Sequence, residues 1–436
     1  MALFGGDDDF DEDEEEEIEL VLFQGALNGK KANMKANARL VQAGLMPAKE
    51  IVTDGIARRA ETIRIEPKGG GSLIRMMVDG VAYPSGKLPK KRALAVTQLL
   101  KLLSGLDEKE RSKPQSGGIN SEYEEEPYQL KIDSVPVKGG AERMTIRIQN
   151  TDDLLERPEE MGFTEDLRIK IRELASRGKG VLLACGAPQT GVSTCALGVL
   201  RSVDAYLYDI QSIADLGGRE LMHVRNLEKL PEDDLDANLM RIIRSEGHVV
   251  FTDPLDTAEV AKTIFTRQED IVIVSEMAAR DSAAGIAQLV EWLGDAEAAA
   301  NGLQAMFSTK LIRKLCKSCK EAFRPNPKLL VKIGLPKKTK ALYRPPQPSE
   351  EEDEEERPPC RNCGDIGYYG RTALYEMLEM TDEMRKLIIA GASPQELRAL
   401  ASEEKMPTFQ SEGLRLVAEG VTSLEELQRS LKKKSK

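Results

Sequence analysis

The sequence predicts an α/β protein in which a mainly parallel, doubly wound sheet follows a smaller α+β domain. Three observations support this prediction. From Glu165 onward, helix-like segments alternate with short apolar runs, whereas residues 50–150 consist mostly of strand-like stretches around glycine turns. An apolar run at 181–184 leads through a glycine-rich turn into another helix-like segment. A chain of 436 residues is long enough for two or three domains.

The composition limits the class of protein. Apolar residues make up 41% of the chain, and no apolar run approaches the roughly 18 residues that would span a bilayer. Because the chain also starts without a signal-peptide pattern, we expect a cytoplasmic protein. The net charge of −11 comes largely from two acidic runs, 7–17 and 350–356, which we expect to be solvated and disordered. An acidic chain without a basic stripe is a poor nucleic-acid binder, so no nucleic-acid partner is expected.

The N-terminal part is predicted to contain an acidic tail at 1–20, a linking segment at 21–46 and an α+β domain at 47–150. Pro47, placed in a first turn, predicts a helix that runs to Arg59. A second helix is predicted at 92–103, and strands are predicted at 62–66, 73–79, 129–135 and 143–149. The last two strands should pair as a hairpin around Gly139 and Gly140.

Residues 151–436 are predicted to form the doubly wound domain and its extensions. The predicted helices are 167–177, 236–245 and 257–267, and the predicted strands are 180–184, 205–209, 249–252 and 271–275. From about Thr381 the pattern is helical. Ser393 and Thr422 each begin a capping box with a glutamate three residues later.

A phosphate-binding loop is indicated by Cys185-Gly-Ala-Pro-Gln-Thr-Gly-Val-Ser-Thr194. The loop pattern is G-x-x-x-x-G-K-[ST], and Gly186, Gly191 and Ser193 stand at the required spacing. Val192 occupies the position of the lysine. The loop can therefore present backbone N–H groups and a hydroxyl to a phosphate and its magnesium ion, but it lacks its own cation.

Four cysteines form two C-x-x-C knuckles, Cys316–Cys319 and Cys360–Cys363. Paired knuckles of this kind supply the four thiolates of a structural zinc site, and a closed four-sulfur set leaves no open position for catalysis. The sequence therefore predicts one structural zinc ion. Cys185 and Cys195 are expected to pack as small apolar groups.

With these motifs in order, the chain resembles the secretion ATPases that drive type II secretion and type IV pilus assembly. The stretches that resemble the family most closely are Leu311-Ile-Arg-Lys-Leu-Cys-Lys-Ser-Cys319 and Cys360-Arg-Asn-Cys-Gly-Asp-Ile-Gly-Tyr-Tyr-Gly-Arg-Thr-Ala-Leu-Tyr-Glu376. Ile63–Pro67, Arg75–Gly80, Gly105–Asp107 and Pro114–Gly117 follow the family's order in the N-terminal half. The likeness covers nearly the whole chain after residue 45.

The resemblance implies a RecA-like P-loop NTPase domain over 151–436, with a zinc-binding subdomain at 311–375 and C-terminal helices at 376–436. Family members are hexameric rings that hold ATP between this domain and the N-terminal domain, and they act from the cytoplasm on an inner-membrane platform protein. By this likeness, the nucleotide would contact Gly186, Gly191, Val192, Ser193 and Thr194 of the loop and Arg75 of the N-terminal domain. A ring of identical chains, or a mixed ring with an active paralogue, is the implied assembly.

The departures from the family pattern cluster at the catalytic positions. In the acidic box after the second strand, Asp209 is kept but its acidic neighbour is replaced by Tyr208. Counting back from Thr257-Ala-Glu259 places Phe251 where the Walker B glutamate belongs, although a shifted pairing would place Asp253 there. Met277 occupies the position of the family's histidine.

Three interpretations of these departures remain open. The first is a relative with weak or lost ATP hydrolysis that acts as a ring or regulatory subunit. The second is an active ATPase that powers pilin or pseudopilin assembly with substitute residues, for which Arg219, Arg241 and Arg244 are the nearest cations in sequence. The third is a scaffold that binds no nucleotide. ATP and Mg²⁺ are therefore conditional cofactors, whereas Zn²⁺ is expected in all three cases.

Overall fold

The computed structural model describes residues 19–216, 220–229, 234–336, 339–347 and 359–432. The chain divides into two compact units, which meet in sequence between Leu154 and Leu155. The acidic runs at 7–17 and 350–356 lie outside the described residues. Among the described residues, no helix is both long enough and apolar enough to cross a bilayer.

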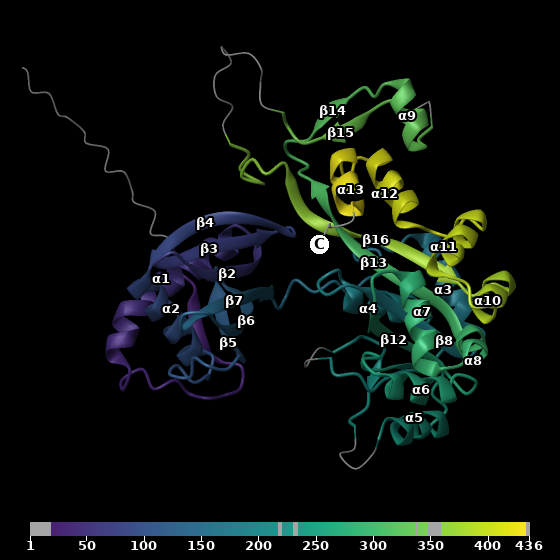
Figure 1. Ribbon diagram of the computed structural model, residues 1–436, viewed down its shortest axis with the longest axis horizontal. Coiled ribbons are helices and arrows are strands. Elements are labelled where there is room, and N and C mark those ends of the chain that lie inside the picture. The colour runs from purple at the N-terminus through teal and green to yellow at the C-terminus, as the bar shows by residue number, and fades with distance from the viewer. Residues whose placement is uncertain (1–18, 217–219, 230–233, 337–338, 348–358, 433–436) are drawn as a thin grey trace, which may run out of the picture. The chain divides into compact units, whose positions relative to one another are not determined.

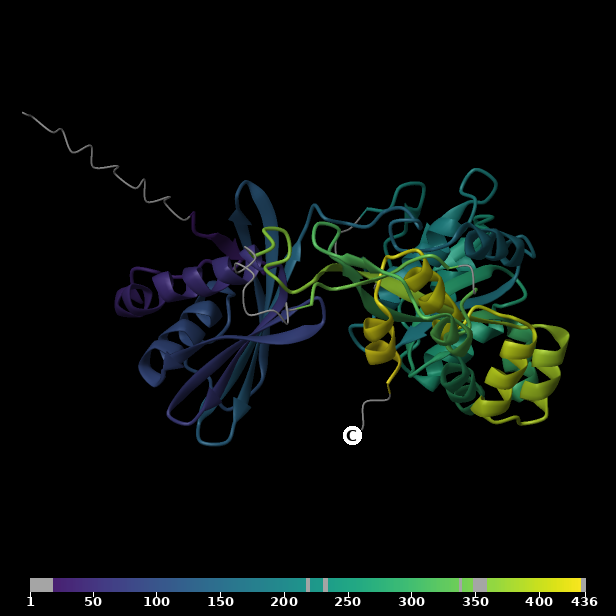
Figure 2. The same ribbon diagram turned by 90° about the horizontal axis from the view of Figure 1, so that it is seen from above.

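The first unit is an antiparallel sheet with the order β1-β5-β6-β7-β2-β3-β4. Figure 2 shows its two helices side by side on one face of this sheet. The strands are β1 (Leu22–Ala26), β2 (Ala60–Lys68), β3 (Gly71–Val78), β4 (Val81–Pro89), β5 (Gln115–Tyr123), β6 (Glu126–Val137) and β7 (Ala141–Asn150), and the helices are α1 (Ala38–Ala57) and α2 (Lys90–Leu103).

Period-two alternation places one face of this sheet in a core. Ile63 and Ile65 of β2 and Ile132 of β6 are fully buried. The predicted hairpin around Gly139 and Gly140 is confirmed as the β6–β7 pair. The predicted helix at 92–103 is confirmed as α2.

The predicted start of the first helix at Pro47 is wrong, because α1 begins at Ala38 and contains Pro47 in its interior. An internal proline removes one helical hydrogen bond. Pro47 is nevertheless buried with Ala48 and Val52, so packing against the rest of the unit outweighs this loss. At Gly44 a Cβ atom would lie 2.7 Å from the carbonyl oxygen of Ala95, so the glycine allows α1 and α2 to approach closely.

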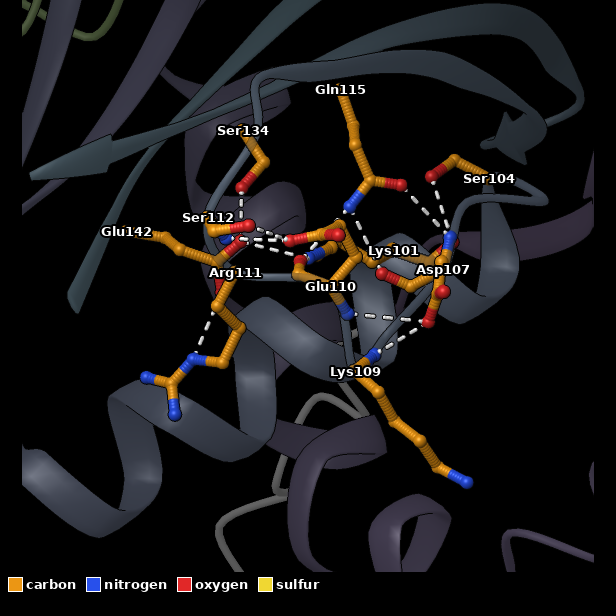
Figure 3. A network of polar contacts seen from close by, with 10 residues as sticks. All are labelled: Lys101, Ser104, Asp107, Lys109, Glu110, Arg111, Ser112, Gln115, Ser134 and Glu142. Carbon is orange, nitrogen blue, oxygen red and sulfur yellow. Dashed lines mark hydrogen bonds and ion pairs between the residues drawn. The ribbon is translucent and has the colours of Figure 1, made fainter. Parts of the chain in front are cut away.

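A buried ion pair holds the segment that follows α2 (Figure 3). Lys101 Nζ lies 2.7 Å from Glu142 Oε1, and both side chains are almost completely buried. The same ammonium group donates to the Glu110 carbonyl oxygen at 2.5 Å, and Ser134 Oγ donates to Glu142 Oε1 at 2.8 Å. The network therefore ties α2, β6 and β7 to the loop between α2 and β5.

The second unit is built on a sheet with the order β10-β9-β11-β12-β8-β13-β16 (Figure 1). The pairs from β10 to β13 are parallel, and β16 is antiparallel to β13. The strands are β8 (Gly180–Gly186), β9 (Ile210–Ser212), β10 (Arg225–Asn226), β11 (Val249–Phe251), β12 (Val272–Ala278), β13 (Leu303–Leu315) and β16 (Tyr368–Glu379). The predicted mainly parallel sheet is confirmed.

Helices cover both faces of this sheet. They are α3 (Glu165–Ala175), α4 (Val192–Ser202), α5 (Leu235–Arg244), α6 (Ala258–Thr266), α7 (Ser282–Leu293) and α8 (Ala296–Gly302). Val272 and Val274 of β12 pack in one core with α3 and α4, whereas Ile273 and Met277 pack in the other core with α5 to α8. Alternate residues of one strand thus serve two cores, which is the doubly wound arrangement.

The strand predicted at 205–209 is wrong, because the strand in this region is β9, which begins at Ile210. Residues 205–207 form a turn instead, with the Leu207 N–H donating to the Asp204 carbonyl oxygen at 3.1 Å. Tyr206 and Leu207 are 91% and 70% exposed, so these residues bury too little apolar surface for a central strand.

The remaining elements extend from the β13–β16 pair. They are β14 (Glu321–Phe323), α9 (Pro327–Ile333), β15 (Leu342–Arg344), α10 (Asp382–Ile389), α11 (Pro394–Glu403), α12 (Phe409–Ala418) and α13 (Leu424–Leu431). The capping box at Ser393 is confirmed. The box predicted at Thr422 is wrong by one residue, because Ser423 caps α13 while Thr422 Oγ1 donates to the Arg313 carbonyl oxygen at 2.8 Å.

Candidate functional site

The candidate phosphate loop connects the carboxyl end of β8 to the first turn of α4. Gly186 ends the strand, and Gly191 precedes the helix with a φ of 88°. A Cβ atom on Gly186 would lie 2.5 Å from Thr190 Oγ1 and 2.7 Å from Val192 Cγ2. Both glycines are therefore required by the local geometry, one for space and the other for its backbone conformation.

Val192 is turned toward the protein rather than toward a ligand. Its half-buried side chain packs against the core shared by α3 and α4, and one of its methyl groups lies over Gly186. Ser193 is exposed at the start of α4, and Thr194 follows it in the same turn. The loop thus offers backbone N–H groups and a hydroxyl but no positive side chain.

Glu276 is the residue that contacts the loop from the neighbouring strand. It lies on β12 on the same face as Val272 and Val274, which is the face that α4 covers. Ser193 Oγ donates to Glu276 Oε1 at 3.0 Å. Burial raises the pKa of Glu276, although the hydrogen bond from Ser193 opposes this shift. Glu276 Oε2 is buried and has no hydrogen-bond partner among the described residues.

Sequence reasoning missed Glu276. It assigned residues 271–275 to a strand and compared Met277 with the family's histidine. A usable signal was nevertheless present, because an acidic residue near the carboxyl end of an apolar parallel strand lies at the edge where such sheets bind ligands.

Two of the replaced catalytic positions are part of the cores. Phe251 is 6% exposed and packs in the core on the α4 face, whereas Met277 is 1% exposed and packs in the core on the other face. Neither side chain can supply a proton acceptor or a hydrogen-bond donor to a nucleotide. Both therefore contribute to stability rather than to chemistry.

Asp253 lies just after β11 at the carboxyl edge, and its carboxylate is engaged locally. Lys229 Nζ forms an ion pair with Asp253 Oδ2, and the Asp215 N–H donates to Asp253 Oδ1 at 2.7 Å. Ser275 Oγ donates to the Asp253 carbonyl oxygen at 2.8 Å. Asp253 is therefore at the correct edge of the sheet, but its charge is already matched by a lysine.

Asp209 lies at the wrong edge of the sheet for the predicted role. It precedes β9, and its carbonyl oxygen accepts from the His248 N–H at 3.0 Å, at the amino end of β11. The phosphate loop lies at the carboxyl end of β8, which is parallel to these strands through β12. Asp209 Oδ2 accepts from Arg225 Nη2 at 2.5 Å. Asp209 therefore lies away from the phosphate loop, at the opposite edge of the sheet.

None of the cations considered from sequence is shown in contact with the loop among the described residues. Arg241 Nη2 donates to the Glu228 carbonyl oxygen at 2.7 Å, and Arg244 ends α5, which leads to the amino end of β11. Arg219 lies outside the described residues. Arg75 belongs to β3 of the first unit, where its Nη1 lies 3.6 Å from Glu66 Oε2.

The four cysteines form a second candidate site. Cys316 and Cys319 follow β13, and Cys360 and Cys363 precede β16. Their sulfur atoms all lie within 4.8 Å of one another, with 3.9 Å between Cys316 and Cys360 and 3.6 Å between Cys319 and Cys363. The antiparallel pairing of β13 with β16 brings the two knuckles together, and the cluster could hold one metal ion.

Hydrogen bonds lower the pKa of two of these thiols, Cys316 and Cys360, the latter mainly through the Cys363 N–H. Burial acts to raise the pKa of Cys316, but the Ser318 N–H and the side chain of Asn362 donate to its sulfur and lower the pKa to about 6. Burial raises the pKa of Cys319 and of Cys363. A cation would offset the mutual repulsion of four thiolates, so the donor set fits a soft divalent ion such as zinc. Cys185 and Cys195 are buried in the cores, as predicted.

The loop fits a magnesium nucleotide only in part. Ser193 and the unpartnered Glu276 Oε2 are oxygen donors of the kind that magnesium accepts. The phosphates would find backbone N–H groups at the start of α4, but no lysine. The oxygen donors for a metal are therefore present, and the cation for the phosphates is absent from the loop.

The comparisons with known proteins agree with this architecture. A family model described as type II/IV secretion system protein matches residues 41–429. The type IV pilus assembly ATPase PilB of Thermus thermophilus is 26% identical over 87% of this chain, and the type II secretion system protein E of Xanthomonas campestris is 25% identical over 87%. The chain covers 42% of the Thermus protein and 66% of the Xanthomonas protein.

Solved structures support the same fold. The ATPase DotB of Legionella pneumophila aligns with a TM-score of 0.54 at 13% identity, covering 87% of this chain and 93% of that one. DotB of Yersinia pseudotuberculosis aligns with a TM-score of 0.55 at 12% identity, covering 87% and 92%. Because the family model extends over most of the sequence, the chain belongs to the type II/IV secretion system protein family.

Proposed function

We propose that this chain is a secretion-ATPase homologue with weak or lost ATP hydrolysis that acts as a ring or regulatory subunit of a pilus or secretion machine. The observation that carries the proposal is Val192, which packs its side chain into the protein where a lysine would meet the phosphates. Phosphoryl transfer depends on charge stabilisation by such cations. The buried Phe251 and Met277 remove two further polar groups.

The proposed assembly follows from the family. A hexameric ring of identical chains, or a mixed ring with an active paralogue, would be attached from the cytoplasm to an inner-membrane platform protein. The phosphate loop would keep Gly186, Gly191, Ser193 and Thr194 around a weakly bound nucleotide, with Arg75 approaching from an N-terminal domain. Zinc at the four cysteines would be structural, because a closed four-sulfur set leaves no coordination position for a substrate.

A second candidate is an active ATPase that powers pilin or pseudopilin assembly, and Glu276 is the observation that favours it. A carboxylate beside the phosphate loop could position an attacking water molecule, although it comes from β12 rather than β11. This alternative still lacks a cation within the described part of the loop. A lysine or arginine would have to reach the site from elsewhere.

ATP turnover by the purified full-length chain decides between the two candidates. We expect the wild-type rate to lie far below an ordinary value of about one per second. The variants Val192→Lys and Val192→Met have unbranched side chains of similar length, so their comparison isolates the charge. Val192→Lys should bind ATP more tightly than Val192→Met, with little gain in turnover because Phe251 and Met277 remain.

One result would reverse the proposal. If the wild-type chain hydrolyses ATP at about one per second or faster, and Ser193→Ala abolishes this activity, the loop is catalytic. The active-ATPase alternative would then stand.

A further inference from the structure

Glu276 differs from the other acidic side chains near this edge of the sheet in how its charge is balanced. Asp253 has Lys229, and Asp281 at the start of α7 accepts from Arg398 Nη2 at 2.7 Å. Within the described residues, Glu276 has only the neutral hydroxyl of Ser193, and its Oε2 atom is buried without a partner. A carboxyl group in this setting is stabilised either by protonation or, when it is ionised, by a nearby cation.

The position of this carboxylate determines what it does to a ligand. Ser193 lies in the first turn of α4, where backbone N–H groups would receive a phosphate group. A carboxylate that accepts from Ser193 at 3.0 Å is therefore close to the same place. With Val192 in place of lysine, the loop supplies no positive side chain to offset repulsion between this carboxylate and a phosphate.

We propose that Glu276 makes nucleotide binding at this loop dependent on a divalent cation, by repelling metal-free phosphates and attracting a metal-bound nucleotide. This inference rests on the proposed nucleotide site and adds the residue that sets its ligand specificity. Metal-free ATP meets a carboxylate with no compensating charge. Mg²⁺–ATP brings a cation for which Ser193 Oγ and the unpartnered Glu276 Oε2 are suitable oxygen donors.

The test is calorimetric titration of the full-length chain with ATP, once with EDTA and once with excess Mg²⁺. Glu276→Gln keeps the shape and can still accept from Ser193, but it carries no charge. Glu291→Gln removes the same charge from an exposed position on α7 and serves as the control. Ser193→Ala removes the hydroxyl and leaves the carboxylate.

The wild-type chain and Glu291→Gln should bind ATP measurably only with Mg²⁺. Glu276→Gln should gain at least about tenfold in affinity for metal-free ATP and lose most of the enhancement by Mg²⁺. Ser193→Ala should weaken Mg²⁺–ATP binding without improving the binding of metal-free ATP. A thermal melt of each variant verifies that it is folded.

Three outcomes would overturn the inference. They are equal affinity of the wild-type chain for ATP with and without Mg²⁺, an unchanged Mg²⁺ dependence in Glu276→Gln, and no ATP binding by any folded variant under either condition. Fast turnover by the wild-type chain would refute the proposed loss of hydrolysis but not the role of Glu276, because these titrations measure binding alone.

Discussion

The tetracysteine cluster and the phosphate loop are both sites where charges on the protein must balance charges on a ligand. The two sites differ in how many of the required ligand-binding groups the chain supplies. The cluster retains all four sulfur donors within 4.8 Å of one another. The loop retains Gly186, Gly191 and Ser193, but Val192 replaces its cation and Glu276 adds an anion beside it. The cluster has all four donor atoms of a tetrahedral metal site, whereas the loop has the backbone shape of a phosphate site but lacks its cation.

This difference shows which features the fold requires by itself. Gly186 and Gly191 are needed whether or not a ligand binds, because a side chain at either position would clash or force an unfavourable backbone conformation. Packing does not require four thiols at the knuckles, since other small apolar residues would fill the same space. A loop of this shape is therefore weak support for nucleotide chemistry, whereas four clustered cysteines are a donor set that could hold a metal ion.

The largest predicted effect concerns the tetracysteine cluster and tests whether it holds a metal ion. We expect one zinc ion per chain by elemental analysis, and we expect its removal by a chelator or by Cys316→Ser to unfold the two knuckle segments around Cys316 and Cys363. Structural zinc sites in small peptides have apparent binding free energies of about 10–16 kcal/mol. The segment between the knuckles keeps a core in which Leu330 and Leu342 pack with Phe409, so the loss should be confined to the knuckles. Hydrogen exchange of the amides around Cys316 and Gly367 measures the loss.

The control for this experiment is Cys195→Ala, which alters a fully buried thiol on α4 but leaves the knuckles intact. Its zinc content should equal that of the wild-type chain. Protein purified without chelator that contains no zinc, or that keeps full amide protection after zinc is removed, would contradict the prediction.

The second predicted effect concerns the buried ion pair of Lys101 and Glu142, in which one side chain balances the charge of another without a ligand. Lys101→Met removes the buried cation beside Glu142 and leaves only the partly exposed Arg111, whose Nε lies 3.4 Å from Glu142 Oε2. We therefore expect the free energy of unfolding of the first unit to fall by at most about 3–5 kcal/mol. The double variant Lys101→Met with Glu142→Leu should recover most of this loss, because no charge then remains buried. Urea unfolding followed by amide exchange in β6 and β7 provides the measurement.

Lys109→Met removes an exposed lysine from the loop after α2 and is the matched control, with an expected effect close to zero. A loss below about 1 kcal/mol for Lys101→Met would contradict the prediction and would mean that Arg111 alone is sufficient to balance the buried carboxylate of Glu142.

The features that the sequence predicted correctly depend on local chemistry. Alternating apolar residues identified the β6–β7 hairpin, and the spacing within each cysteine pair predicted that two distant knuckles form one cluster. The errors arose where packing between elements decides the outcome. Burial of Pro47 keeps a proline inside α1, and exposure of Tyr206 keeps an apolar segment out of the sheet.

The candidate nucleotide site shows the same limit. Gly186 and Ser193 could be placed from their spacing, but Glu276 reaches Ser193 across two elements that are distant in sequence. The predicted strand at 205–209 placed Asp209 at a carboxyl end. Because β9 instead begins at Ile210, Asp209 lies at the amino end of the strand and at the opposite edge of the sheet. Strand order and register, which sequence patterns define poorly, therefore decide which acidic residue meets the loop.

The smallest predicted effect concerns Glu376, another buried carboxylate of the same sheet, and tests whether such a group is destabilised when it is ionised, as is assumed for Glu276. Glu376 on β16 is 8% exposed and accepts from the Ser282 N–H at 3.3 Å. Burial and the nearby Asp281 raise the pKa of Glu376, and the hydrogen bond from the Ser282 N–H and the charge of Arg398 oppose this shift only in part. Cys185 is the other titratable group that faces it.

A raised pKa in the folded state means that the folded state holds the proton more tightly than the unfolded state does. The stabilisation is fully present below the unfolded pKa of about 4.3 and is lost as the pH rises through the folded pKa. Glu376→Gln is neutral at every pH, so its stability relative to the wild-type chain should rise with pH in this window by at most about 1.4 kcal/mol per pH unit. Chemical denaturation at a series of pH values measures the difference, with Glu291→Gln as the exposed control. A difference that stays flat or falls with increasing pH would mean that a carboxylate buried in this sheet is stable when ionised, so that Glu276 also would not need a metal-bound ligand.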